Sequence, residues 1–140
     1  MKLNELVINS GINQRNCTGN AEVKIKGIAY DSRKVHPGYL FVCICGTHYN
    51  GHDYILDAIE RGAVAVVISE DVKVHNGLGI VKVKDSRKAL GKIASTFYNN
   101  PSNSMFCIGI TGTKGKTTTT YMIKSILDQA GMTCGIIGTL

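Results

Sequence analysis

The sequence predicts an α/β protein with a small N-terminal α/β domain, followed by the start of a P-loop-type domain with a parallel sheet. Three observations support this prediction. Strand-type apolar runs alternate with helical periodicity through roughly the first hundred residues. A segment rich in Asn, Ser and Pro interrupts the pattern at 99–104. A strand-type run, a glycine-rich loop and a helical pattern then follow from residue 105. We therefore expect domains at 1–98 and 105–140, joined by a linker at 99–104.

Each expected element of the first domain follows from apolar periodicity and from a turn or capping residue at its end. A short amphipathic helix opens the chain and ends at Gly11, and a loop is expected at 13–21. Asp53 and Asp85 are each placed to cap a following helix. The expected strands are half-buried or buried apolar runs, at 23–30, 39–45, 63–68 and 79–83. Of these, 39–45 and 63–68 are nearly continuous apolar runs, which predicts burial on both faces.

The second expected domain opens with a loop suited to phosphate. Residues 112–118 read Gly-Thr-Lys-Gly-Lys-Thr-Thr, between a strand-type run at 105–110 and a helical pattern that reaches Ala130. Glycines let backbone N–H groups approach a polyphosphate at the positive end of a helix. Lys116 would add charge near the outer phosphates, and the Thr117 hydroxyl would help to hold Mg²⁺. The alternative is a threonine-rich helix start with solvated lysines, which the agreement of strand, loop and helix disfavours.

Little sequence follows this loop. A nucleotide-binding domain needs several parallel strands and a carboxylate-bearing strand for the metal. Beyond the helix there is only a possible strand at 134–137. We therefore expect this chain to be the N-terminal part of a longer enzyme.

The charge composition indicates which class of partner the chain binds. The net charge of +6 is spread along the chain, which suits an anionic small molecule. Nucleic acid is the competing interpretation, but the sequence contains no run of five basic residues.

The five cysteines are an odd number without a C-x-x-C pair, so we expect buried thiols in a reducing compartment and no zinc site. No signal peptide and no apolar run of membrane-spanning length is recognisable, so the cytoplasm is expected, without membrane contact.

The tripeptide Asp-Ser-Arg occurs twice, at 31–33 and 85–87. The second copy opens a helix, where Asp and Ser satisfy free amides. The first lies after a strand, and in open α/β sheets ligands bind beyond the carboxyl ends of strands. Ser32 and the loop Thr47-His48-Tyr49 are therefore candidate ligand contacts, with a plain turn as the alternative.

Two stretches, in the expected order, resemble the Mur ligases. Within residues 28–70 the chain reads Asp-Ser-Arg-x-Val-x-Pro-Gly-x-Leu-Phe-Val and then Gly-His-Asp-Tyr-Ile. This is similar to the N-terminal uridine-nucleotide domain of the ligases that add the third residue of the peptidoglycan stem peptide. The run Thr-Gly-Thr-Lys-Gly-Lys-Thr at 111–117 is similar to the ATP loop of that family, with Lys114 where Asn is commoner.

The resemblance implies an ATP-dependent amide ligase. The terminal carboxylate of UDP-N-acetylmuramoyl-dipeptide would take the γ-phosphate as an acyl phosphate, and the amine of an amino acid would then displace phosphate. Lys116 would be the catalytic residue and Thr117 the Mg²⁺ ligand. The implied ATP-binding residues are Gly112, Thr113, Lys114, Gly115, Lys116, Thr117 and Thr118. The implied contacts with the UDP part are Tyr30, Ser32, Thr47, His48 and Tyr49.

Thr47-His48-Tyr49 stands where some relatives have His-Gln-Ala. Two alternatives remain open: the Mur ligase that completes the pentapeptide, and a non-catalytic nucleotide-binding fragment. We expect a monomer, and we expect the 140 residues alone to be inactive.

Overall fold

The computed structural model describes residues 1–72 and 77–138. The chain divides into two compact units, Met1–Pro101 and Ser102–Leu140, and each is described by itself. The division falls inside the segment 99–104, where a short 3-10 helix, η4 (Pro101–Ser104), lies in place of the expected irregular linker.

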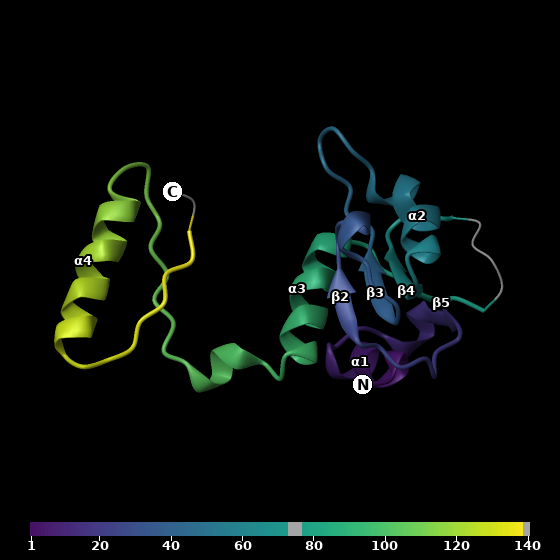
Figure 1. Ribbon diagram of the computed structural model, residues 1–140, viewed down its shortest axis with the longest axis horizontal. Helices are drawn as coiled ribbons and strands as arrows, with labels where there is room; N and C mark the ends of the chain where they lie inside the picture. Colours follow the sequence, from purple (N-terminus) through teal and green to yellow (C-terminus); the bar gives the residue numbers. More distant parts are fainter. Residues whose placement is uncertain (73–76, 139–140) are drawn as a thin grey trace. The chain divides into compact units, whose positions relative to one another are not determined.

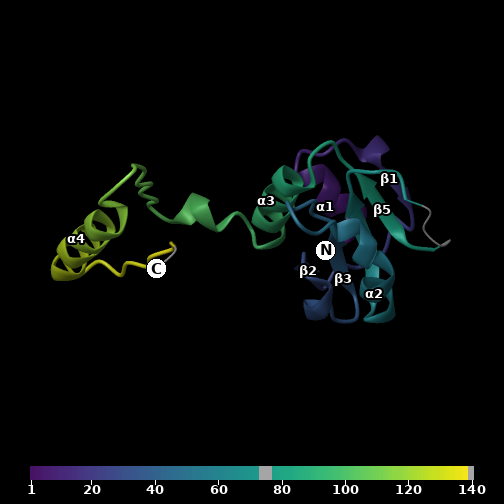
Figure 2. The ribbon, with the colours of Figure 1, turned by 90° about the horizontal axis from the view of Figure 1, so that it is seen from above.

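The first unit is a sheet of α/β type with helices on both faces (Figures 1 and 2). Its strand order is β1-β5-β4-β3-β2, in which β2 to β5 are parallel and β1 pairs antiparallel with β5. The strands are β1 (Cys17–Gly19), β2 (Gly27–Ala29), β3 (Tyr39–Val42), β4 (Ala63–Ile68) and β5 (Gly79–Lys82). The α-helices are α1 (Leu3–Asn9), α2 (Ile55–Glu60) and α3 (Ser86–Phe97). Short 3-10 helices are η1 (Gln14–Asn16), η2 (Ser32–Lys34) and η3 (Gly51–Tyr54).

The sheet separates two apolar clusters. Along β3, Leu40 and Val42 belong to the cluster shared with α1 and α3, whereas Phe41 belongs to the cluster shared with α2. Alternation of this kind fills both faces, since successive side chains of a strand point to opposite sides. Burial of β3 and β4 on both faces is thus confirmed.

Three expected boundaries of the first unit are wrong. The expected loop at 13–21 contains β1, an edge strand too short to show a periodic pattern. Residues 23–26 are not part of β2. Backbone groups of Val23 and Ile25 bond to the start of the chain, since Leu3 N–H donates to Val23 O and Ile25 N–H donates to Met1 O, both at 2.9 Å. The strand expected at 39–45 ends at Val42.

The cap expected before α2 is also wrong. Asn50, not Asp53, caps this segment, because its side chain accepts a hydrogen bond from His52 N at the start of η3. The helix proper then begins at Ile55. Asp85 does cap α3 as predicted, since its carboxylate accepts from Lys88 N at 3.0 Å.

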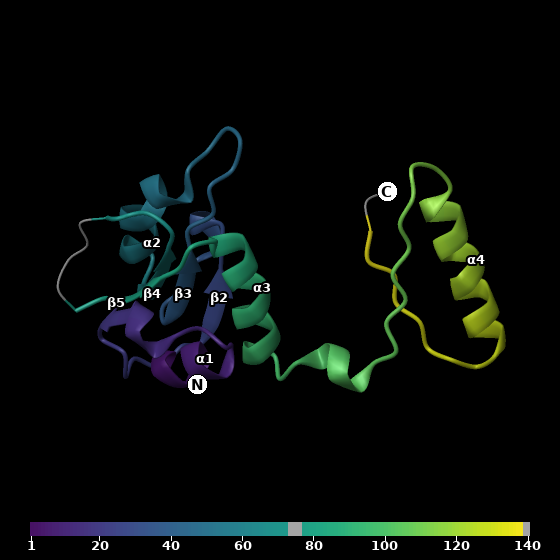
Figure 3. The ribbon, with the colours of Figure 1, turned by 180° about the vertical axis from the view of Figure 1, so that it is seen from behind.

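The second unit contains the predicted helix, α4 (Lys116–Gln129), but not the predicted strands (Figure 3). Residues 105–110 and 134–137 carry no strand pairing, and the side chains at 105–109 are exposed. A strand is defined by a neighbour that accepts and donates its backbone hydrogen bonds, and described residues 102–138 offer none. The expectation of buried thiols fails here as well, because Cys107 is exposed, as is Cys45 in the first unit.

Among the described residues, no helix combines the length and the apolar character needed to cross a membrane.

Candidate substrate and nucleotide sites

The candidate substrate contacts lie at one end of the sheet of the first unit. Ser32 opens η2, three residues after the end of β2, and Thr47 to Tyr49 lie in the loop that follows β3. Because β2 and β3 are parallel neighbours, their carboxyl ends meet at the same edge, where ligands bind in open α/β sheets. The topology therefore brings the two predicted groups of contacts to one edge.

Ser32 is held in place by its surroundings. The residue is buried, and hydrogen bonding from its side chain is the main cause that lowers the pKa of Asp57 on α2, with the Arg61 ion pair adding to it. A hydroxyl that donates to a carboxylate keeps its acceptor lone pairs and its backbone amide. Ser32 can therefore receive a hydrogen bond from a ligand N–H through its hydroxyl, or donate to a ligand through its own N–H.

Asp31 fixes the turn that carries Ser32. Its carboxylate accepts from Arg33 N at 3.1 Å, from Arg33 Nε at 2.9 Å and from Arg33 Nη2 at 2.8 Å. This forked contact with Arg33 is the main reason why the pKa of Asp31 falls from 3.8 to about 2. Tyr30, on the other side of Asp31, is 63% exposed and free to cover a ligand.

The loop after β3 is a small hairpin. Cys45 and Asn50 form an isolated antiparallel bridge, and Gly46 N–H donates to Tyr49 O at 2.9 Å. Thr47 and His48, which lie between Gly46 and Tyr49 at the tip of the hairpin, are exposed, and Tyr49 is 74% exposed. A short loop with a closed base and an exposed tip is suited to contact a ligand at the sheet edge.

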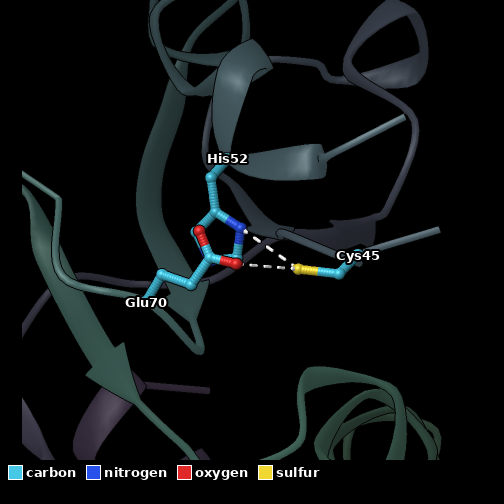
Figure 4. A group of neighbouring side chains, drawn as sticks. All are labelled: Cys45, His52 and Glu70. Carbon is cyan, nitrogen blue, oxygen red and sulfur yellow. Dashed lines mark hydrogen bonds between the residues drawn. The ribbon is translucent and has the colours of Figure 1, made fainter. Parts of the chain in front are cut away.

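Sequence reasoning missed a cluster at the base of this hairpin (Figure 4). Cys45 Sγ lies 3.4 Å from Glu70 Oε1 and 3.7 Å from His52 Nδ1. Burial and the neighbouring Glu70 raise the pKa of the Cys45 thiol, whereas hydrogen bonds from Asn50 and Cys45 lower the pKa of Glu70. Cys45 and His52 are seven residues apart, but Glu70 lies 25 residues after Cys45, and only the strand order indicates that the segments after β3 and β4 meet.

In the second unit the candidate phosphate loop leads into α4. Gly112 and Gly115 both have positive φ, of 154° and 77°, which L side chains rarely adopt. The first helical hydrogen bond runs from Thr119 N to Gly115 O at 2.9 Å, so the preceding amides of the first turn have no acceptor within the helix. The side chains of Gly112 to Thr118 are all exposed. This arrangement presents backbone donors to an anion.

Lys116 is bent back over the loop. Its Nζ donates to Gly112 O at 2.6 Å, which places the ammonium at the mouth of the loop rather than in open solvent. Among the threonines, Thr120 donates to Lys116 O at 2.8 Å, whereas Thr117 and Thr118 are exposed at the N-terminal end. A bound phosphate would compete with the Gly112 carbonyl for the ammonium.

The phosphate loop offers part of the ligand set that a Mg²⁺ ion needs. Thr117 supplies a hydroxyl oxygen, which is a ligand type that Mg²⁺ accepts. The single carboxylate within described residues 102–138 is Asp128, which lies in the last turn of α4 and pairs with Lys124 at 2.8 Å. The loop can therefore contribute one ligand, and further oxygens would come from nucleotide phosphates and water.

Comparisons with known proteins identify the family of the chain. The sequence model of the Mur ligase family catalytic domain matches residues 24–98, and that of the Mur ligase middle domain matches residues 110–140. The chain therefore belongs to the Mur ligase family. It is 45% identical over 130 residues to the UDP-N-acetylmuramoyl-L-alanyl-D-glutamate--2,6-diaminopimelate ligase of Clostridium perfringens (strain 13 / Type A), covering 93% of this chain and 27% of the relative. The chain thus spans about a quarter of the length of such curated relatives.

Two solved structures share the fold at lower identity. The first is the UDP-N-acetylmuramoylalanyl-D-glutamyl-2,6-diaminopimelate--D-alanyl-D-alanyl ligase of Acinetobacter baumannii, with 28% identity and a TM-score of 0.58 over 75% of this chain and 23% of that one. The second is the MurF ligase of Thermotoga maritima in complex with ADP, with 27% identity and a TM-score of 0.57 over 76% of this chain and 24% of that one. The predicted α/β class is confirmed.

Proposed function

We propose that this chain belongs to an ATP-dependent ligase that joins 2,6-diaminopimelate to UDP-N-acetylmuramoyl-L-alanyl-D-glutamate. The observation that carries the proposal is the 45% identity, across 93% of the chain, to a curated ligase named for this reaction. Eight curated relatives that are 41–50% identical over 84–100% of this chain are all named for 2,6-diaminopimelate, which supports this amino acid as the third residue. We further propose that the enzyme is a cytoplasmic monomer.

In this proposal the first unit holds the UDP part of the substrate. Ser32 would receive or donate one hydrogen bond to the ligand while Asp57 keeps its hydroxyl oriented. Tyr30 and the Thr47-His48-Tyr49 tip would cover the ligand from the two adjacent strand ends. Binding of this remote, unreactive part of the substrate would position the peptide carboxylate for reaction.

The second unit would hold the triphosphate of ATP. Amides from Gly112 to Thr118 would donate to phosphate oxygens, and Lys116 would move from Gly112 O to the transferred γ-phosphoryl group. Mg²⁺ bound with the help of Thr117 would neutralise charge on the phosphates. The peptide carboxylate attacks the γ-phosphorus to give an acyl phosphate and ADP, and the amine of the amino acid then displaces inorganic phosphate to form the amide.

Two alternative functions are weaker. The ligase that adds D-alanyl-D-alanine shares the fold, but its solved example is 28% identical to this chain, against 45% for the diaminopimelate-adding relative. A non-catalytic nucleotide-binding module would bind ATP and UDP without catalysing a reaction between the bound molecules.

A phosphate-release assay distinguishes the two functions, because only in a ligase does phosphate release depend on both the UDP-dipeptide and the amino acid.

The test uses a full-length ligase that carries this sequence. In such an enzyme Lys116→Ala should lower kcat for phosphate release by at least about a hundredfold, because a preorganised charge at the transferred group is lost. Ser32→Ala should raise KM for the UDP-dipeptide with little change in kcat. Lys92→Ala and Ser102→Ala are the matched controls, since both residues are exposed and lie outside the candidate sites. Phosphate release that needs no UDP-dipeptide would refute the ligase assignment.

The 140-residue chain gives a second test. Calorimetric titration should detect weak binding of UDP-N-acetylmuramoyl-dipeptide, and Ser32→Ala should weaken it. We expect no turnover of ATP by this chain alone. Phosphate release that depends on the dipeptide would contradict that expectation.

A further inference from the structure

The cluster below the hairpin joins the segments that follow β3 and β4 and the start of η3 into one hydrogen-bond network. Cys45 follows β3, Asn50 and His52 begin η3, and Ser69 and Glu70 follow β4. His52 is buried in the middle, with only 8% of its surface exposed. Donors and acceptors in this network can be assigned one by one, because one of the donors is a backbone amide whose role is fixed.

The fixed donor is Ser69 N–H, which lies 3.0 Å from His52 Nε2. Nε2 must therefore be the acceptor, so the neutral imidazole carries its proton on Nδ1. Nδ1 lies 2.7 Å from Asn50 Oδ1, and an N–H at this position donates to that oxygen. The backbone N–H of Ser69, the residue after β4, therefore fixes the tautomer of His52.

The remaining donors then have one consistent assignment. Asn50 Oδ1 already accepts from His52 Nδ1 and from the His52 backbone N–H at 3.1 Å, which uses both of its lone pairs. The thiol of Cys45 is left to donate to Glu70 Oε1 at 3.4 Å. The Asn50 amide group donates to Glu70 Oε2 at 3.2 Å, so the carboxylate accepts at both oxygens.

The same assignment argues against a metal ion among Cys45, His52 and Glu70, although their ligand atoms lie within 4.8 Å of one another. Only Nδ1 of His52 faces the thiol, and it carries the proton. Coordination through Nδ1 would need a proton on Nε2, directly against the Ser69 N–H. A metal-bound histidine normally donates its other ring N–H to an acceptor, whereas the group that faces Nε2 here, Ser69 N–H, is a donor.

We propose that Asn50, His52 and Glu70 are positioning residues that fix the base of the hairpin 46–49 onto the end of β4, and so preorganise its tip for the UDP-linked substrate. This inference rests on the proposed function for the role of the tip, but the network itself does not. A loop already held in its binding geometry loses less conformational entropy when the ligand binds. Without the network, the backbone bonds around the Cys45–Asn50 bridge would remain to define the hairpin: Gly46 N–H to Tyr49 O at 2.9 Å and Gly51 N–H to Ile44 O at 3.0 Å.

The first experiment tests the network on the 140-residue chain. Nitrogen-15 NMR of His52 should show a protonated Nδ1 and an unprotonated Nε2, and addition of Zn²⁺ should not shift these signals. In Glu70→Ala the Gly46 amide should exchange with solvent at least about fivefold faster, because two donors lose their acceptor. Glu60→Ala on α2, also an exposed glutamate, is the matched control and should leave the exchange unchanged.

The second experiment tests the consequence for binding. Calorimetric titration with UDP-N-acetylmuramoyl-dipeptide should give a Kd about five- to tenfold higher for Glu70→Ala than for the unmodified chain, and Glu70→Gln should restore most of the affinity, since its amide oxygen can accept from Asn50. Unchanged Gly46 exchange in Glu70→Ala, a protonated Nε2, or a shift on addition of Zn²⁺ would overturn the network. Faster Gly46 exchange with unchanged Kd would overturn the positioning role. Absence of any binding by the unmodified chain would instead count against the proposed function.

Discussion

Asp31 and Asp85 show how one tripeptide takes two roles at the residue scale. Both begin an Asp-Ser-Arg sequence, and both carboxylates accept a backbone N–H at the start of a helical turn. Of the two carboxylates, only Asp31 accepts two hydrogen bonds from the guanidinium of the arginine in its own tripeptide, Arg33. This is possible because η2 is a single turn, which lets the Arg33 side chain point back towards Asp31. Asp85 instead precedes the long helix α3, and the charged group that pairs with it, Lys88 Nζ, lies 3.9 Å from Asp85 Oδ2. Local context, not the tripeptide, decides which carboxylate is strongly stabilised.

The lowered pKa of Asp31 predicts a defined pH dependence. A carboxylate whose pKa is about 2 in the folded state and 3.8 otherwise binds fewer protons when folded, so it stabilises the fold above its ordinary pKa. That contribution is lost as the pH falls from about 5 to about 2. Asp31→Asn should therefore lower the melting temperature near neutral pH and flatten its decline on acidification. Asp57 and Glu70, whose pKa values are also lowered, remain in the variant and leave part of the slope.

Thermal unfolding followed by circular dichroism across this range measures the effect. Asp53→Asn is the control, because Asp53 is an exposed carboxylate of the neighbouring η3. An Asp31→Asn chain whose melting temperature declines as steeply as that of the unmodified chain would show that the Arg33 contact does not contribute.

At the scale of elements, the central strands carry the packing. β3 and β4 lie in the middle of the sheet, and Leu40 on β3 is fully buried against α1 and α3. Leu40→Ala should lower the free energy of unfolding by about 3 kcal/mol, since it removes apolar contacts and leaves a cavity. Leu56→Ala is the matched control on α2, where the side chain is 64% exposed, and it should change stability by no more than about 0.5 kcal/mol. Urea denaturation measures both, and equal losses would contradict the assigned core.

The same elements show what sequence could predict. The apolar run of β4 was predicted with its observed bounds, the start of β3 was predicted at Tyr39, and helices were predicted after Asp85 and after the glycine-rich loop, where α3 and α4 lie. Residues 105–110 have the composition of a buried strand but carry no pairing, because strand formation depends on a neighbour that periodicity cannot supply. β1 was missed for the opposite reason: its three residues pair with β5 without any apolar pattern.

Some features of the candidate sites could likewise be predicted from the sequence, and others could not. The phosphate loop was predicted because its chemistry lies in one contiguous stretch, from Gly112 to Thr118. The contacts of Ser32 with Asp57, and of His52 with Ser69, join residues whose proximity depends on strand order. Contiguous sequence motifs therefore predicted a ligand class, whereas the groups that orient their residues became visible only in the folded chain.

At the scale of the whole molecule, both apolar clusters consist of residues from the first unit. None of the described residues 102–138 is buried, and α4 exposes large apolar side chains such as Met122 and Ile126. The stability of the chain should therefore reside in Met1–Pro101. The second unit should contribute little cooperativity of its own, because a helix without a packed face is marginal in water.

A shortened chain of residues 1–101 tests this division. It keeps both clusters and every strand among the described residues, so it should unfold in a single transition within about 4 °C of the full chain, a shift that corresponds to less than about 1 kcal/mol for a domain of this size. Leu40→Ala should lower the melting temperature equally in both lengths, because its contacts all lie within the first unit. Differential scanning calorimetry measures the transitions. A much larger loss of stability on shortening would mean that residues 102–140 support the first core, and the two units would then have to be treated as one cooperative structure.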